Sequence, residues 1–273
     1  MNPDVVEAAF WAEYLRNRNV DAGSAGDGAL SVAGGYALCV PGTLRAYAIG
    51  AGSTRPLRAD DLLAVATFYA KRGLVAAYEL ADDVAARDRD VLEAAGLTHD
   101  ATRVRAVYSG SAAAPEEEPG SGIVMRTTND RRAFIAILLR GFADEPQGAD
   151  ARLQRTLALQ AAVAQTLVIA SIDGEDAGAA AVAVHGDVAL LFSAAVLPSA
   201  RGRGLHAALL AARLRAARGR GATTATLAAE RGSRAERTAL RFGFTHIHDR
   251  LRWEAQAVAA MEPAAAEAAT PSS

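Results

Sequence analysis

The segment Val196–Ala207 has the residue types of a phosphate-binding loop. Gly202 and Gly204 precede a predicted helix, and glycine lets a backbone approach a bulky ligand with several N–H groups pointing outward. The first N–H groups of a helix lack acceptors within it, and the helix dipole attracts anions to that end. Arg201 and Arg203 add positive charge on either side. The segment therefore predicts a pyrophosphate-binding site.

A dinucleotide-binding domain is the rival interpretation of the same segment. Gly202, Gly204 and Ala207 match the pattern G-x-G-x-x-A, and Glu230 stands where a ribose-binding acid belongs. However, only about forty residues follow Glu230, which is too few for the rest of a doubly wound domain. Pro198 and its neighbours also separate the preceding strand from the first glycine, whereas the dinucleotide turn is tight. We therefore reject this interpretation.

Glu230 is the best candidate for a general base, because it ends a predicted strand close to the loop. It could take a proton from a substrate ammonium directly or through water. The alternative interpretation is a solvated glutamate at a strand end. His206 is a second candidate base, although a histidine at a helix start is often only exposed. His246 and His248 alternate on the last predicted strand and are expected on one face of it.

The elements that position these residues alternate in type through the C-terminal part of the chain. Apolar periodicity and turn residues predict the following strands and helices: strand 123–126, a helix containing Phe134 and Leu138, helix 149–165, strands 167–171, 179–185 and 188–196, helix 204–218, strand 223–229, helix 233–242 and strand 247–253. An antiparallel start and a β-α-β-α-β finish imply a mixed sheet with helices on both faces.

The N-terminal part repeats the second half of that plan. Its predicted elements are strand 44–50, helix 60–72, strand 75–80, helix 83–95 and strand 102–108. Gly96 and Gly243 stand at corresponding positions of the two parts. Domain duplication is therefore favoured over a chance similarity in the order of helices and strands. The predicted organisation is a domain over 1–108, a linker over 109–122, a second domain over 123–254 and a disordered tail over 255–273.

The sequence resembles the GNAT N-acetyltransferase superfamily. The segments V-L-P-S-A-R-G-R-G-L-H, G-S-R-A-E-R-T-A-L-R-F-G-F and R-L-R-W carry the resemblance, which covers 121–254 well and 40–108 more weakly. It is closest to bacterial tandem members whose N-terminal half is degenerate. The implied fold is α/β (α+β), with two tandem GNAT-like domains, each a mixed, mostly antiparallel sheet flanked by helices.

The resemblance implies direct transfer of an acetyl group from acetyl-CoA, a co-substrate, to an amine of a small molecule or protein in a ternary complex. Strand 188–196 would diverge from its neighbour at a bulge, and Val196 would also help catalysis by donating its N–H to the thioester carbonyl. The implied cofactor-binding residues are Val196, Leu197, Arg201, Gly202, Arg203, Gly204, Leu205, His206, Ala207 and Thr238.

Three positions depart from the family pattern. His206 replaces a glycine or alanine, Thr238 replaces a common asparagine, and Ala239 replaces the usual tyrosine acid. A departing thiolate with a reference pKa of about 8.5 can still be protonated from water. A catalytically weak acyl-CoA-binding or scaffold module of the same fold is therefore the alternative function.

Composition narrows the remaining classes of function. A net charge of −2 favours neither nucleic acid nor membranes as partners, and no apolar run has the length of a membrane span. Cys39 is the single cysteine and no metal-binding histidine pattern is present, so neither a metal site nor a disulfide is expected. Lys71 is the only lysine among many arginines, which indicates a GC-rich bacterial genome, and a cytoplasmic location is expected. The sequence does not identify the amine acceptor or the oligomeric state. A homodimer is possible.

Overall fold

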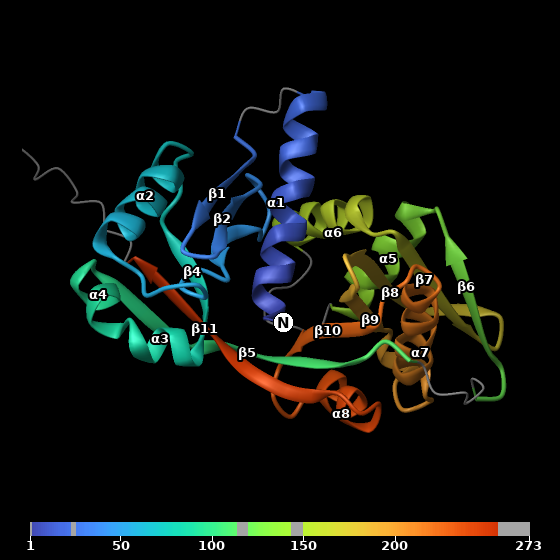
Figure 1. The fold of residues 1–273 in the computed structure, drawn as a ribbon. Helices are drawn as coiled ribbons and strands as arrows, with labels where there is room; N and C mark the ends of the chain where they lie inside the picture. Colours follow the sequence, from blue (N-terminus) through green and yellow to red (C-terminus); the bar gives the residue numbers. More distant parts are fainter. Residues whose placement is uncertain (1, 23–25, 114–119, 143–149, 256–273) are drawn as a thin grey trace, which may run out of the picture.

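A single mixed sheet of eleven strands runs through the protein (Figure 1). The structure is a computed structural model and describes residues 2–22, 26–113, 120–142 and 150–255. Across the sheet the strands follow the order β1-β2-β3-β4-β11-β5-β10-β9-β8-β7-β6. The predicted mixed sheet flanked by helices is confirmed in both halves of the chain.

The elements alternate between helices and strands in both halves of the chain. The N-terminal half contains α1 (Pro3–Ala22), β1 (Gly28–Val32), β2 (Gly35–Cys39), β3 (Ala46–Ile49), α2 (Ala59–Ala70), β4 (Ala77–Ala81), α3 (Asp82–Arg87), α4 (Arg89–Ala94) and β5 (Leu97–Ser111). The C-terminal half contains β6 (Ile123–Thr128), α5 (Arg131–Gly141), α6 (Ala151–Val163), β7 (Thr166–Ile172), β8 (Glu175–His185), β9 (Val188–Val196), the 3₁₀ turn η1 (Pro198–Ala200), α7 (Leu205–Arg218), β10 (Thr224–Ala229), α8 (Arg234–Arg241) and β11 (Thr245–Ala255).

The helices of the C-terminal half cover opposite faces of the sheet. Along β7, Val168 and Ala170 pack in one cluster with Leu209 of α7. The alternating residues Leu167 and Ile169 pack in another cluster, with α5 and α6. Successive side chains of a strand point to opposite faces, so α7 lies on one face and the α5–α6 pair on the other.

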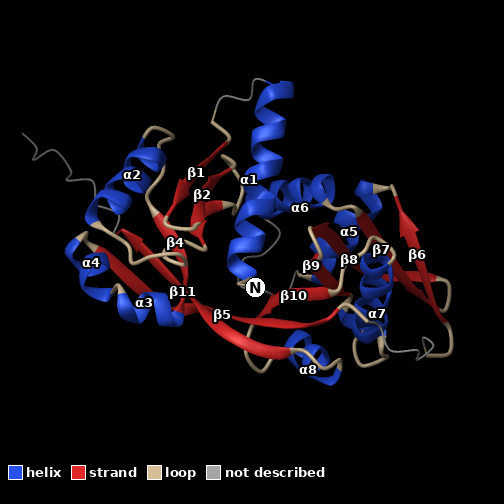
Figure 2. Cartoon of the chain, in the orientation of Figure 1, coloured by secondary structure: helices blue, strands red, loops and turns tan. Residues whose placement is uncertain are grey.

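The last strand of each half is inserted into the sheet of the other half (Figure 2). β11 lies between β4 and β5, and β5 lies between β11 and β10; all three of these pairs are antiparallel. The predicted boundary at 109–122 therefore does not separate two sheets. It also starts too early, because Ser109–Ser111 belong to β5. The predicted linker residues 114–119 and tail residues 256–273 lie outside the described residues.

A buried group of charges fixes α1 to β11. Asp4 is 1% exposed and accepts a hydrogen bond from Arg250 Nε at 2.7 Å. His248 Nε2 lies at hydrogen-bond distance, 3.0 Å, from the other carboxylate oxygen of Asp4. Glu7 accepts from Arg250 at 2.8 Å and from Arg45 at 3.0 Å. The guanidinium groups provide the opposite charges that buried carboxylates need.

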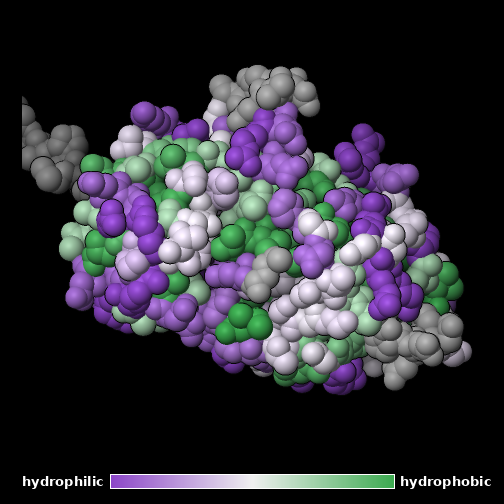
Figure 3. Space-filling view, in the orientation of Figure 1, coloured by the Kyte–Doolittle hydropathy of each residue, from purple (hydrophilic) through white to green (hydrophobic). Residues whose placement is uncertain are grey.

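The surface shown in Figure 3 has hydrophobic side chains in small groups among hydrophilic ones. No helix in the described ranges is long and apolar enough to cross a membrane.

Candidate functional site

The parallel strands β9 and β10 separate and leave a slot in the sheet. They pair only through Val188–Leu190 and Thr224–Thr226. Further along β9, Ser193 has a left-handed φ of 49°, and the register with β8 shifts between Ala179 and Ala181. A bulge of this kind bends a strand away from its ladder. The divergence and the bulge implied by the family resemblance are therefore both present.

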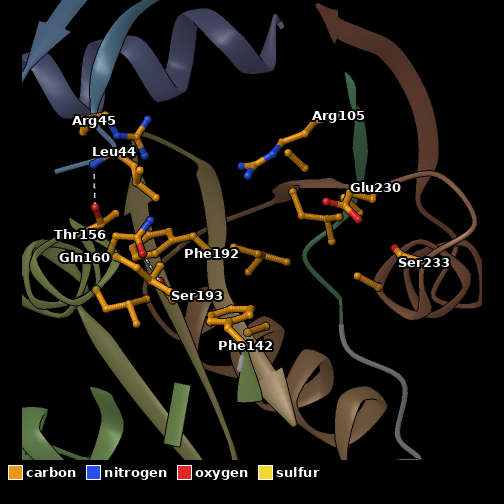
Figure 4. Close-up of a pocket in the computed structure, with 18 of the residues that line it drawn as sticks. Leu44, Arg45, Arg105, Phe142, Thr156, Gln160, Phe192, Ser193, Glu230 and Ser233 are labelled. Atoms are coloured by element: carbon orange, nitrogen blue, oxygen red, sulfur yellow. Dashed lines mark hydrogen bonds between the residues drawn. The ribbon is translucent and has the colours of Figure 1, made fainter. Parts of the chain in front are cut away.

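A cavity of about 330 Å³ lies in the slot and is lined from both faces of the sheet (Figure 4). His206 and Leu210 of α7 line it on one side. Thr156 and Gln160 of α6 line it on the other. Because α6 and α7 cover opposite faces, the cavity passes through the sheet. Two reactants could thus meet in it from opposite sides.

The glycine loop, Arg201–Gly204, leads into α7 at one end of the slot. Gly202 and Gly204 have φ values of 86° and 88°, a backbone conformation that favours glycine. In the described part of the chain, no backbone or side-chain acceptor takes the N–H groups of Gly202–Ala207. These donors stand at a helix N-terminus, where they suit an anion such as a pyrophosphate.

The two arginines of the loop were expected to bind phosphate, but both contact other parts of the protein. Arg201 donates to the carbonyl oxygens of Val196 at 3.3 Å and Gly141 at 3.0 Å, which ties the end of β9 to the end of α5. Arg203 forms an exposed ion pair with Asp173 at 2.6 Å. The backbone N–H groups of Gly202–Ala207, rather than these two side chains, are the donors that have no partner among the described residues.

Val196 and Leu197 differ in what they can offer a ligand. Leu197 N–H donates to Ala177 O at 2.8 Å, so this N–H is not available to a ligand. Backbone groups alternate in direction along an antiparallel ladder, so the N–H of Val196 points away from β8 and toward the slot. Val196 N–H remains the candidate donor to a thioester carbonyl.

Glu230 follows β10 immediately, is exposed, and lines the cavity. Because Ala229 pairs with Ala106, the cross-strand neighbour of Glu230 is Arg105. Figure 4 shows the side chains of Glu230 and Arg105 at the same side of the cavity. Arg105 was missed because it comes from β5 of the N-terminal half, and nothing in its local sequence indicates that partner.

His206 is partly buried rather than exposed at the helix start. Its Nδ1 is buried without a hydrogen-bond partner in the described residues. Burial, together with Arg213, Arg234 and Arg241, lowers its pKa to about 4. The imidazole is therefore neutral at pH 7, which makes it a poor proton acceptor compared with an ordinary histidine.

Thr238 does not line the cavity, contrary to the expectation that it contacts the cofactor. It is 2% exposed, and its hydroxyl donates to Arg234 O at 2.9 Å within α8. Ala239, at the position of the family's tyrosine acid, is fully buried in the core. Neither residue supplies a proton donor to the slot.

Three further residues of the cavity were not found from the sequence. Ser193 donates from its hydroxyl to Gln160 Oε1 at 2.7 Å, which joins β9 to α6 at one side of the cavity. Arg213 lines the cavity from α7 and is 3% exposed. Its position seven residues after His206, on the same helix face, was the available signal.

The described residues of the N-terminal half form no corresponding slot. β3 and β4 pair through Ile49 and Glu79, where β3 ends. In the following loop, N–H groups are already bonded: Ser53 to Gly50 O and Leu57 to the Asp88 carboxylate. The described residues contain no cluster of histidine, cysteine and acidic side chains that could hold a metal ion.

Comparison with known proteins agrees with this geometry. Residues 132–244 match the model of the Acetyltransferase (GNAT) family. No protein of curated function matches the sequence. A GCN5-related N-acetyltransferase from Kribbella flavida is similar in structure, with a TM-score of 0.67 and 16% identity over 94% of this chain and 97% of that one.

Two more solved structures share the fold. A tandem GNAT protein from the clavulanic acid biosynthesis pathway, solved without AcCoA, has a TM-score of 0.54 and 16% identity over 76% of this chain and 73% of its own. A GCN5-related N-acetyltransferase from Sphaerobacter thermophilus has a TM-score of 0.50 and 21% identity over 66% and 59%. At these identities the similarity is one of fold.

Proposed function

We propose, from the premise that residues 132–244 belong to the acetyltransferase (GNAT) family, that this chain transfers an acetyl group from acetyl-CoA to an amine. One observation carries the proposal: the N–H groups of Gly202–Ala207 have no acceptor among the described residues, and they lead into α7, whose His206 and Leu210 line the slot between β9 and β10. These N–H groups would hold the pyrophosphate. The amine acceptor, on a small molecule or a protein, would enter from the α6 face.

Each chemical role falls to a residue of the slot. Glu230 would accept the proton of the substrate ammonium, directly or through water. The free amine would then attack the thioester carbonyl, whose oxygen would accept a hydrogen bond from Val196 N–H. A C–N bond forms and the C–S bond breaks. The nitrogen loses its second proton to water, and water protonates the thiolate. Placing both reactants in one cavity supplies much of the rate, since no residue need act as a nucleophile.

Titration calorimetry of the full chain with acetyl-CoA, and with NADH as the control ligand, tests the site. We expect micromolar affinity for acetyl-CoA alone. Gly204→Glu should abolish this binding, because it places a negative charge where the pyrophosphate would lie. Gly221→Glu is the matched control, since Gly221 has almost the same φ, 89° against 88°, at the far end of α7. Equal loss in both variants, or none in Gly204→Glu, would overturn the assignment.

A catalytically weak acyl-CoA-binding module is the second candidate, and Ala239 favours it. At the position of α8 where the family usually has a tyrosine acid, this chain has the buried Ala239. This candidate predicts acetyl-CoA binding without CoA release on a broad panel of amines. Amine-dependent CoA release would exclude it.

The proposed location is a bacterial cytoplasm. Cys39, the only cysteine, is a buried free thiol, and burial raises its pKa to about 11. A protein without disulfides suits a reducing compartment. Neither nucleic acid nor a membrane is proposed as a partner.

A further inference from the structure

Arg213 is a buried cation that faces the slot without a counter-ion among the described residues. It is 3% exposed and lines the cavity from α7. Its Nε donates to Leu209 O at 3.3 Å. Among the described residues no carboxylate pairs with it, and burial alone lowers its pKa to about 10, so the guanidinium is charged at pH 7. A buried charge without a partner destabilises a fold, so core packing alone does not account for it.

Further arginine charge acts on His206, the residue that precedes Arg213 on the same face of α7. His206 lies two turns earlier and has a buried Nδ1 without a partner in the described part of the chain. Arg213, Arg234 and Arg241 all lower the pKa of this histidine by their charge, after burial itself. The cavity wall formed by α7 therefore suits an anionic ligand group rather than a neutral one.

The position of Arg213 indicates which part of a ligand it would meet. The bond to Leu209 shows that the side chain folds back along α7, toward the slot. Arg213 follows Gly204 by about 13 Å along the helix axis at about 1.5 Å per residue. Leu191, at the closed end of the slot just beyond the last β9–β10 pair, lines the same cavity. A CoA thioester with its pyrophosphate on the glycine loop would thus extend its acyl end toward Arg213.

We propose, on the basis of the proposed function, that the slot prefers short acyl groups ending in a carboxylate, such as malonyl or succinyl, over neutral acyl groups of similar length. Arg213 receives the terminal carboxylate. The transfer itself is unchanged: the amine nitrogen bonds to the thioester carbon and releases a proton to water, the C–S bond breaks, and CoA leaves as a thiolate that takes a proton from water. The product is an amide that carries a carboxylate in place of a cationic amine.

Calorimetry with matched acyl-CoA pairs tests the proposal. Succinyl-CoA is compared with butyryl-CoA, and malonyl-CoA with propionyl-CoA, on the full chain. We expect each carboxylated donor to bind about tenfold more tightly or better, as for a hydrogen bond to a charged group. Arg213→Met should erase the difference within each pair. Arg215→Met, on the exposed side of the same helix, should keep it.

The outcomes separate this inference from the proposed function. Equal affinity within each pair, with binding of all four, would overturn the carboxylate preference and leave acyl transfer standing. A folded Arg213→Met that keeps the preference would also overturn it, because the carboxylate would then lie elsewhere. Failure of every CoA thioester to bind would instead refute the proposed function. The wild-type comparison needs no variant, so it decides even where Arg213→Met does not fold.

The stability of Arg213→Met gives an independent measurement. Without ligand, the variant should melt at the same temperature as the wild type or higher, because it removes an unpaired buried charge. A clear loss of Tm would assign Arg213 to the support of the fold and count against the proposal.

Discussion

Glu230 and Arg105 bring charge from the two halves of the chain to one side of the slot. Glu230 is exposed in the cavity, so it can exchange protons with water and reach an acceptor that enters from the α6 face. Arg105 stands opposite it on β5. The proposed base therefore has a charged cross-strand neighbour that the C-terminal half does not contain.

We predict that Glu230→Gln lowers kcat/KM by about 10²- to 10⁴-fold, the usual contribution of a general base. Acetyl-CoA affinity should change little, because the phosphate-binding loop is untouched. Steady-state kinetics and calorimetry on the same samples measure the two effects. Glu93→Gln, an exposed glutamate far from the slot, is the control. Wild-type turnover in Glu230→Gln would remove the residue from the mechanism.

At the scale of elements, α1 and β11 are joined by charges rather than by apolar packing alone. Asp4 and Arg250 are both buried, and their mutual attraction lowers the pKa of Asp4 against the opposing effect of burial, which is the larger single influence. Glu7 shares the same guanidinium. This arrangement gives β11 a fixed position in a sheet whose other members come from the opposite half.

Arg250→Met should therefore destabilise the protein by about 3–5 kcal/mol, because it leaves the buried carboxylate of Asp4 without its main partner and removes one of the two arginines that contact the half-buried Glu7. Chemical denaturation at pH 7 measures the change. Arg218→Met, at the exposed end of α7, should stay within about 0.5 kcal/mol of wild type. A loss below about 1 kcal/mol for Arg250→Met would mean that water or another cation compensates the carboxylates.

Elements defined by local pattern were predictable from the sequence. The bounds of β9 match the prediction, and α7 begins one residue later than expected, because alternation, glycine and helical periodicity are local signals. His246 and His248 were wrongly expected on one face. A register shift lies between them; His248 meets Asp4, whereas His246 contacts Asp249 and the ring of Tyr108.

The partners of β5 and β11 were not predictable. An apolar strand has the same pattern whichever strand it pairs with, so nothing in 97–111 indicates insertion beside β10. Arg213 shows the same limit at the site. Its residue type and helical position are visible in the sequence, but the lack of a counter-ion depends on every element packed around it.

For the whole molecule, the exchange of strands makes the two halves interdependent. Separately produced, residues 1–113 would lack the strand that covers β4, and residues 114–273 would lack the strand that joins β10 to β11. Exposed strand edges promote aggregation. We therefore predict that neither fragment is soluble and folded alone.

Produced together, the two fragments should associate into a complex with the circular dichroism and acetyl-CoA affinity of the intact chain. Size-exclusion chromatography and calorimetry measure both properties. A stable, monomeric 114–273 fragment that binds acetyl-CoA would show that β5 is dispensable, and would contradict the prediction.

The insertion of β11 beside β4 also has a consequence for synthesis on the ribosome. Roughly 130 residues separate the end of β5 from the start of β11, which takes on the order of ten seconds at about 5–20 residues per second. Throughout that interval the nascent N-terminal half has an incomplete sheet, and β4 keeps an open edge. The half made first is thus finished last, and chaperones have their longest access to the segment that was translated earliest.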